Sequence, residues 1–181
     1  MCKTPLSALF MSAMLVGGAS PALAVDSGTV TFNGKIIEDT CNVTVNGDAT
    51  NGTVNFSDLH PSVFSIDNSV GESQSFDIAL KDCDKNVDNM NIKFKGTTIS
   101  GKSEEVLQPS GDATHVGIRL KDWTGAAVKF DDSEPVTASN KAIKDTGAAT
   151  FTYTADVVQV GDVLPTAGDY TAQATYTLLY R

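Results

Sequence analysis

The sequence predicts an all-β protein built as an antiparallel sandwich. Short runs in which every second residue is apolar recur along the chain, which is the period of a strand with one buried face. Segments rich in Gly, Asn and Asp separate these runs at the spacing typical of a β-sandwich. Beyond the N-terminal apolar run, no segment sustains the period of an amphipathic helix.

The first 24 residues are predicted to be a signal peptide. Lys3 precedes the apolar run 6–18, and the small residues Ala22 and Ala24 form a signal-peptidase site, which predicts cleavage after Ala24. A membrane anchor is the less favoured alternative, because the run is short and rich in small residues. Residues 25–181 then suffice for one domain with a sizeable core.

This mature chain is strongly acidic. The whole sequence has a formal net charge of −9, and the signal peptide removes one Lys and no acid, which leaves about −10. Such a charge disfavours nucleic acid and anionic lipid as partners. No other segment approaches the ~20 apolar residues that a membrane-spanning helix needs, so no span is expected in the mature form.

The first strand is expected over residues 28–37. Val30, Phe32 and Ile36 alternate with polar residues, but Gly34 falls on the apolar phase, where a side chain is expected. Glycine at such a position allows another backbone to approach closely, or else marks a bulge or a weakness in packing. The residues alone leave both interpretations open.

The same alternation predicts the remaining strands, with helical turns expected only around 57–62. Strands are expected at 53–56, 73–83, 91–96, 115–122, 126–130, 150–158 and 170–181. We expect the last one to lie within a sheet, because an exposed terminal strand would be an edge prone to aggregation. Its apolar phase holds Tyr170, Ala172, Ala174, Tyr176, Leu178 and Tyr180.

Two cysteines are predicted to form a disulfide. Cys2 leaves with the signal peptide, and Cys41 and Cys83 remain as an even pair in an exported chain. A zinc or redox pair is disfavoured, because no His lies near either residue and no Cys-x-x-Cys occurs. Closing a loop of this length is worth about 4 kcal/mol in the chain-entropy model.

The sequence favours neither a catalytic site nor a metal site. His60 and His115 are the only histidines, and no Gly-x-Ser-x-Gly surrounds any serine. The run 82–93 resembles a calcium loop only at its start, because Val87 and Lys93 replace the required Gly and the closing Glu. We therefore expect no cofactor, no metal and no enzymatic activity.

Two features of the sequence allow more than one interpretation. Asn42 and Asn51 match the N-glycosylation pattern, which occurs often by chance. Trp123 beside a glycine turn suits a sugar-stacking site, but a lone Trp is more often a core or rim residue, which is the interpretation we favour.

Several elements in order resemble the pilins of chaperone–usher fimbriae, most closely the major subunit of type 1 fimbriae. "GTVTFNGKIIEDTC" resembles the N-terminal extension and first strand, "FDIALKDCD" the strand with the second cysteine, and "THVGIRLKDWTGAAV" the central strand and turn. Gly168 and the penultimate Tyr180 resemble the family's terminal motif. The chain departs from the pattern at Arg181, which follows that Tyr, and at Trp123.

The resemblance implies an incomplete immunoglobulin-like sandwich that lacks its last strand and is completed by a donor strand from a neighbouring subunit. It implies a signal peptide at 1–24, a donor-strand extension at 25–37 and a pilin domain at 38–181. The inward donor positions would be Gly28, Val30, Phe32, Gly34 and Ile36. The acceptor groove, which also contacts the chaperone, would include Gly168, Tyr170, Ala172, Ala174, Tyr176, Leu178 and Tyr180.

The implied function is that of a structural subunit of an adhesive surface fimbria. The implied partners are identical or related pilins, an outer-membrane usher, and a periplasmic chaperone that binds the carboxylate of Arg181. A minor adaptor or tip-proximal pilin is the alternative. An adhesin is less favoured, because its extra lectin domain would not fit the chain, and a copper–zinc dismutase would need more than two histidines.

Overall fold

A computed structural model describes residues 29–34 and 41–181. These two stretches fall in different units of the chain and are described separately. The predicted signal peptide, and the predicted donor positions Gly28 and Ile36, lie outside the described residues. Residues 29–34 form no strand, and all six are exposed, with Val30 74% and Phe32 89% accessible.

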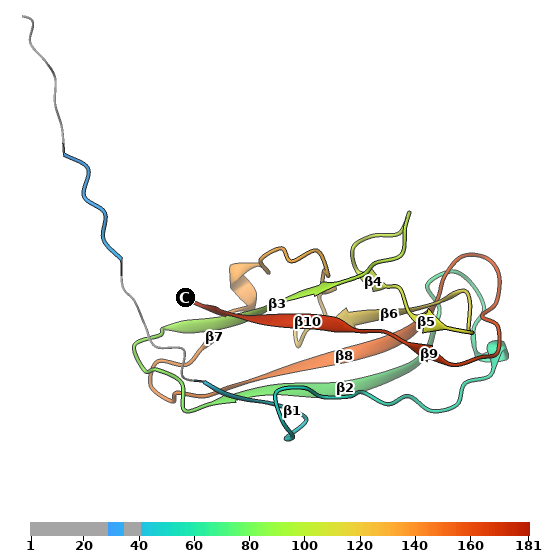
Figure 1. Ribbon diagram of the computed structural model, residues 1–181, viewed down its shortest axis with the longest axis horizontal. Coiled ribbons are helices and arrows are strands. Elements are labelled where there is room, and N and C mark those ends of the chain that lie inside the picture. Colours follow the sequence, from blue (N-terminus) through green and yellow to red (C-terminus); the bar gives the residue numbers. More distant parts are fainter. Residues whose placement is uncertain (1–28, 35–40) are drawn as a thin grey trace, which may run out of the picture. The chain divides into compact units, whose positions relative to one another are not determined.

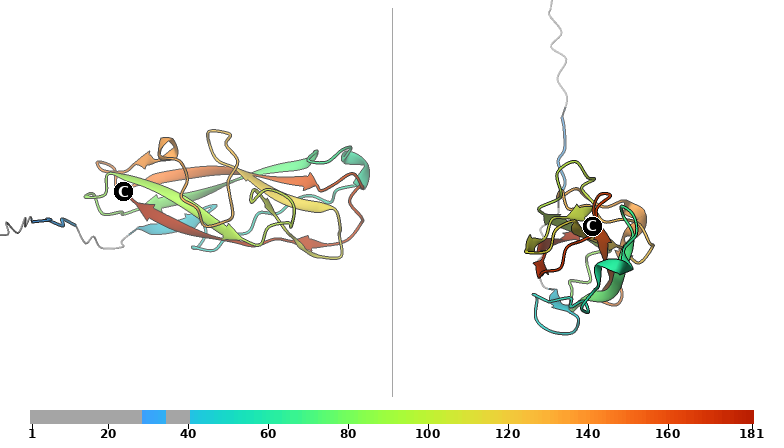
Figure 2. Two further views of the ribbon diagram at one scale, coloured as in Figure 1. Left: turned by 90° about the horizontal axis from the view of Figure 1, so that it is seen from above. Right: turned by 90° about the vertical axis from the view of Figure 1, so that its right-hand side faces the viewer.

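The larger described stretch, residues 41–181, is an antiparallel β-structure (Figure 1). The larger sheet has the order β1-β2-β8-β6-β4, a second sheet has the order β10-β3-β7, and β5 pairs with β9. The strands are β1 (Asn42–Val45), β2 (Val70–Lys81), β3 (Asn89–Gly96), β4 (Val106–Leu107), β5 (Ser110–Gly111), β6 (Val116–Lys121), β7 (Lys141–Ala142), β8 (Ala149–Gln159), β9 (Tyr170–Thr171) and β10 (Ala174–Tyr180). Two 3-10 turns, η1 (Pro61–Val63) and η2 (Thr137–Ser139), complete the fold (Figure 2).

The core lies between the two larger sheets. Phe76 of β2 is opposite Tyr153 of β8 in the register, and their rings stack with centroids 5.6 Å apart. Phe94 of β3 reaches across from the second sheet and meets the Tyr153 ring edge-on at 5.1 Å. Alternation in these three strands therefore directs the apolar residues of both sheets into one cluster.

The predicted disulfide is present. Cys41 immediately precedes β1 and Cys83 follows β2, so the bond joins the ends of two paired strands. Predictions for β2, β3, β6 and β8 are also confirmed, as is the short turn near residue 60. Trp123 packs edge-on against Phe151 and Tyr153 at the margin of the core, as expected for a rim residue.

Besides the strand expected at 28–37, whose described residues 29–34 form none, three strand predictions are wrong in whole or in part. Residues 53–56 form no strand, and 126–130 form only an isolated bridge through Ala127. The expected strand 170–181 divides into β9 and β10, which pair with different partners. Alternation reports only which side chains are buried, and it does not show whether a second backbone lies within hydrogen-bonding distance.

A buried charge lies on the outer face of the larger sheet. Asp156 of β8 is fully inaccessible, and its carboxylate accepts a hydrogen bond from Ser73 and ion pairs with Arg119 and Lys121 at 3.1 and 2.7 Å. Burial by itself raises the pKa of Asp156, but the bonds from Lys121, Ser73 and Arg119 outweigh this effect and lower it. The cluster ties β2, β6 and β8 together at their centre.

Candidate binding groove

The sandwich is open along one side of β10. In the described part of the chain, β10 pairs only with β3 and β1 pairs only with β2, and each stands at the end of its sheet. Residues 50–59, which follow β1, form no strand that would close the gap. The backbone donors and acceptors along the free edge of β10 are therefore available to another strand.

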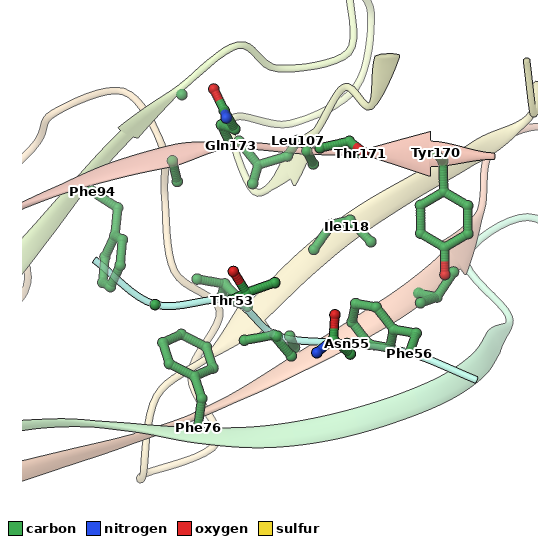
Figure 3. Close-up of a pocket in the computed structure, with 18 of the residues that line it drawn as sticks. Thr53, Asn55, Phe56, Phe76, Phe94, Leu107, Ile118, Tyr170, Thr171 and Gln173 are labelled. Carbon is green, nitrogen blue, oxygen red and sulfur yellow. The ribbon is translucent and has the colours of Figure 1, made fainter. Parts of the chain in front are cut away.

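A cavity of about 1870 Å³ follows this opening (Figure 3). Its floor is the hydrophobic core, with Phe76, Ile118 and Val157 contributed by the larger sheet and Phe94 by the second sheet. The result is a long groove with an apolar floor beside an unpaired strand edge.

The residues of β10 that face the groove are only half covered. Tyr176, Leu178 and Tyr180 are intermediate in burial. Their register partners on β3, which are Phe94, Ile92 and Met90, are 5%, 2% and 0% exposed. The core side chains of β3 are thus fully covered, whereas those of β10 are still partly exposed to solvent. Apolar side chains of another segment would therefore be buried favourably against β10.

The segment 50–59 forms the opposite wall. Figure 3 shows Thr53, Asn55 and Phe56 lying between β10 and β2. Phe56 packs against the core and approaches the Tyr170 ring, with centroids 6.5 Å apart.

Two polar contacts hold this wall. The backbone nitrogen of Ser57 donates a hydrogen bond of 2.8 Å to the Glu72 carboxylate. Tyr176 Oη donates a hydrogen bond of 2.7 Å to the Thr50 carbonyl, which ties the wall to β10 across the groove.

Burial raises the pKa of the groove tyrosines further above neutral pH. Desolvation raises the pKa of Tyr176, and desolvation together with the nearby Glu72 charge raises that of Tyr170. Both hydroxyls are uncharged at neutral pH, as a phenol of ordinary pKa already is, and burial moves them further from ionisation. The wall of the groove can accept apolar groups without burying a phenolate.

Gly168 shapes one end of the groove. Its φ of +151° lies in a region that side chains rarely adopt, and a Cβ there would lie 2.6 Å from the Ala113 nitrogen. Gly168 lines the cavity together with Pro165 and Thr166. A larger residue at position 168 would push the two loops apart.

The structure brings the seven sequence-predicted groove residues to this cavity. Its lining includes Gly168, Tyr170, Ala172, Ala174, Tyr176, Leu178 and Tyr180. Sequence reasoning missed the wall at 50–59 as part of the site, although the alternation of Val54 and Phe56 was a signal that one side of it is buried. Of the predicted donor positions, Val30, Phe32 and Gly34 are described, and they are exposed.

The other candidate sites of the sequence are surface turns. Asp84 accepts hydrogen bonds from the backbone and side chain of Asn86, as in an ordinary turn. Within 29–34 and 41–181, no three His, Cys, Asp or Glu side chains gather as metal ligands would. Over the same residues, no helix has the length and hydropathy to cross a membrane.

Known proteins are similar to this chain in sequence. The family model described as "Fimbrial protein" matches residues 30–181. The chain is 32% identical to "Type-1 fimbrial protein, C chain" of Escherichia coli, covering 97% of both chains. It is likewise 32% identical to "Type-1 fimbrial protein subunit" of Serratia marcescens, covering 98% of this chain and 97% of the relative.

Solved structures share the fold. A chain from a chaperone–usher pilus, solved in a study of rod uncoiling, aligns with a TM-score of 0.62 at 25% identity, covering 90% of this chain and 100% of that one. The P pilus rod subunit PapA aligns with a TM-score of 0.61 at 24% identity, covering 77% and 99%.

Proposed function

The chain belongs to the fimbrial protein family, and we propose that it is a structural pilin of an adhesive surface fimbria, polymerising head to tail by donor-strand exchange. Its relatives of similar length are named as fimbrial subunits. The observation that carries the proposal is the open groove beside the free edge of β10.

The donor in this proposal is residues 25–37 of a neighbouring copy. A strand over residues 29–37 would span about 30 Å. Its inward positions would be Gly28, Val30, Phe32, Gly34 and Ile36. Strand addition of this kind takes its affinity from main-chain hydrogen bonds and its specificity from side-chain pockets.

The apolar residues of the donor supply the driving force. Val30 and Phe32 are largely exposed. Burying these two and Ile36 would contribute about 1.5–3 kcal/mol each, before the hydrogen bonds of the ladder. A Cβ added to Gly34 would meet no atom within 4 Å in the single chain, and its absence would let the acceptor backbone approach closely.

The geometry of the exchange produces a filament. The donor segment and the groove are different surfaces of one chain, so each subunit would offer one of each. Heterologous contacts of this type build open assemblies when the rotation between subunits does not close a ring.

Before assembly, the groove would need a temporary occupant. An exposed apolar groove beside a strand edge is an aggregation hazard. The resemblance to chaperone–usher pilins supplies a periplasmic chaperone that lends a strand, and an outer-membrane usher that exchanges it. Arg181 and Asn89 exchange two backbone hydrogen bonds of 2.8 Å, which would hold the end of β10 in place for such a partner.

An unboiled denaturing gel of shed surface fibres tests the function. The chain is compared with a variant that lacks Val25 to Ile36. We expect a ladder of oligomers that collapses to monomer only on heating, and monomer alone for the variant. Monomer from both, without fibres in the electron microscope, would reject the structural pilin assignment.

A further inference from the structure

We propose that Asn33 is a site of spontaneous deamidation, and that insertion of the donor strand protects it. Subunits that remain unassembled would then lose the ability to donate as they age. The protective half of this inference rests on the proposed donor role, whereas the reactivity of Asn33 does not.

The chemistry follows from an Asn-Gly pair. The backbone nitrogen of Gly34 attacks Cγ of Asn33, the Cγ–Nδ2 bond breaks, and the side-chain nitrogen leaves as ammonia. Water then opens the resulting cyclic imide and gives either aspartate or isoaspartate. Because Gly34 has no side chain to hinder its nitrogen, this pair closes the ring more readily than Asn followed by a larger residue.

The structure distinguishes Asn33 from a comparable pair in the folded unit. Asn33 and Gly34 are exposed and lie outside any strand or helix, and a Cβ added to Gly34 would meet no atom within 4 Å. Asn46 and Gly47 form a tight turn, in which the Asn46 side-chain oxygen accepts a 3.0 Å hydrogen bond from the Asp77 backbone. That bond restrains rotation of the Asn46 side chain towards the Gly47 nitrogen, so the same dipeptide is held in an unreactive geometry.

A third Asn-Gly pair is less informative. Asn51 is exposed, but Gly52 packs against the Val45 side chain, and both line the groove. A donor strand inserted into the groove would change the surroundings of Asn51, so its rate would also differ between free subunits and fibres. Asn46 is therefore the better internal reference.

Isoaspartate at position 33 would disable the donor. It adds a methylene group to the backbone between Phe32 and Gly34. Side chains of a strand alternate strictly, so an inserted backbone atom changes the phase between the residues on its two sides. Val30 and Phe32 would then no longer face the groove in register with Ile36.

Strand insertion would protect the amide. In a ladder the backbone is fixed in an extended conformation, and ring closure needs a local opening that frees the Gly34 nitrogen and the Asn33 side chain. Gly34, which would fit the groove, thus leaves the Asn33 amide open to deamidation until the strand is inserted.

Mass spectrometry of two samples tests the proposal. Mature subunit from cells without an usher and fibres sheared from complete cells are incubated in parallel at mildly alkaline pH. We expect Asn33 to convert to aspartate and isoaspartate in the free subunit, and at least about tenfold more slowly in fibres, with Asn46 intact in both. An intact Asn33 in the free subunit, or equal rates in both samples, would overturn the proposal.

Asn33→Gln supplies the matched variant. Position 33 lies on the outward phase of the donor, and glutamine keeps the amide but closes a less favourable ring. Fresh variant and fresh parent should assemble equally, and after ageing only the parent should lose fibre yield. An equal loss of fibre yield in aged parent and aged variant would refute the effect of deamidation on strand donation. If neither fresh protein assembles, the donor role fails, while amide loss in the free subunit is still measured.

Discussion

The hydroxyl of Tyr176 holds the groove wall in place. It donates to the Thr50 carbonyl across the space that a donor strand would use. Removing it by Tyr176→Phe keeps the apolar ring and loses a hydrogen bond worth about 0.5–1.5 kcal/mol. The segment 50–59 would then be displaced from β10 more easily.

We therefore expect Tyr176→Phe to bind a peptide of residues 25–37 roughly 2- to 10-fold faster than the parent. Stopped-flow fluorescence of a labelled peptide measures the rate. Thr152→Val is the control, because Thr152 is an exposed position on β8 that does not line the cavity. An unchanged rate in Tyr176→Phe would show that the wall does not gate the groove.

Asp156 is a buried charge with partners on two neighbouring strands. Asp156→Asn leaves Arg119 and Lys121 without their anion, and we expect a loss of about 2–3 kcal/mol in the free energy of unfolding at neutral pH. The value lies below the about 3–5 kcal/mol usual for breaking a fully buried pair, because the Lys121 side chain is 38% exposed and screened by water.

The pH dependence of this loss has a defined sign. The native pKa of Asp156 is lowered from 3.8, so its charge stabilises the fold fully above that value. The difference between Asp156→Asn and the parent should shrink as the pH falls below 3.8 and vanish below the native pKa. Urea unfolding across this range measures it, and a difference that does not depend on pH would contradict the assignment.

The face on which a residue lies was predictable from the sequence wherever apolar and polar residues alternate along a strand. This alternation placed Tyr176, Leu178 and Tyr180 on one face, and all three line the groove. It gave no sign of Asp156, whose charged partners come from a strand distant in the sequence. Contacts of that kind depend on register between strands, which a local pattern does not encode.

At the scale of elements, the proposed donor strand would require a residue without a side chain at position 34. Gly34→Leu places a side chain where we propose that the acceptor backbone approaches closely. We expect the variant subunit to fold, with its disulfide formed, and to yield no fibres. Electron microscopy and the unboiled gel measure the yield.

Thr31→Leu adds the same side chain on the outward phase of the donor and serves as the control. It should assemble normally. Normal fibre yield from Gly34→Leu would remove the proposed role of this glycine.

The long strands were predictable, and the short ones were not. β2 and β8 have clear alternation, because one face of each packs on the core. β4, β5, β7 and β9 contain two residues each, which is too few for a period to appear. The wall at 50–59 has one half-buried side but no described strand partner, so its pattern predicted a strand that the single chain does not form.

For the whole molecule, the central feature is an incomplete sandwich. β10 lacks a neighbour among the described strands on one side, and the core below it is open. The same chain carries an exposed segment with Val30 and Phe32 on one phase. Insertion of a donor strand beside β10 would thus complete the sandwich of one subunit and join that subunit to the next.

Photo-crosslinking from position 32 tests this claim most directly. Phe32 is replaced by a benzophenone amino acid, fibres are irradiated, and the crosslinked peptides are identified by mass spectrometry. Mixed isotope labels separate crosslinks between subunits from crosslinks within one. If the donor strand of one subunit fills the groove of the next, crosslinks between subunits will join position 32 to groove residues such as Ile118, Phe56 or Leu178. Crosslinks only within one subunit, or only to the outer face of the larger sheet, would contradict it.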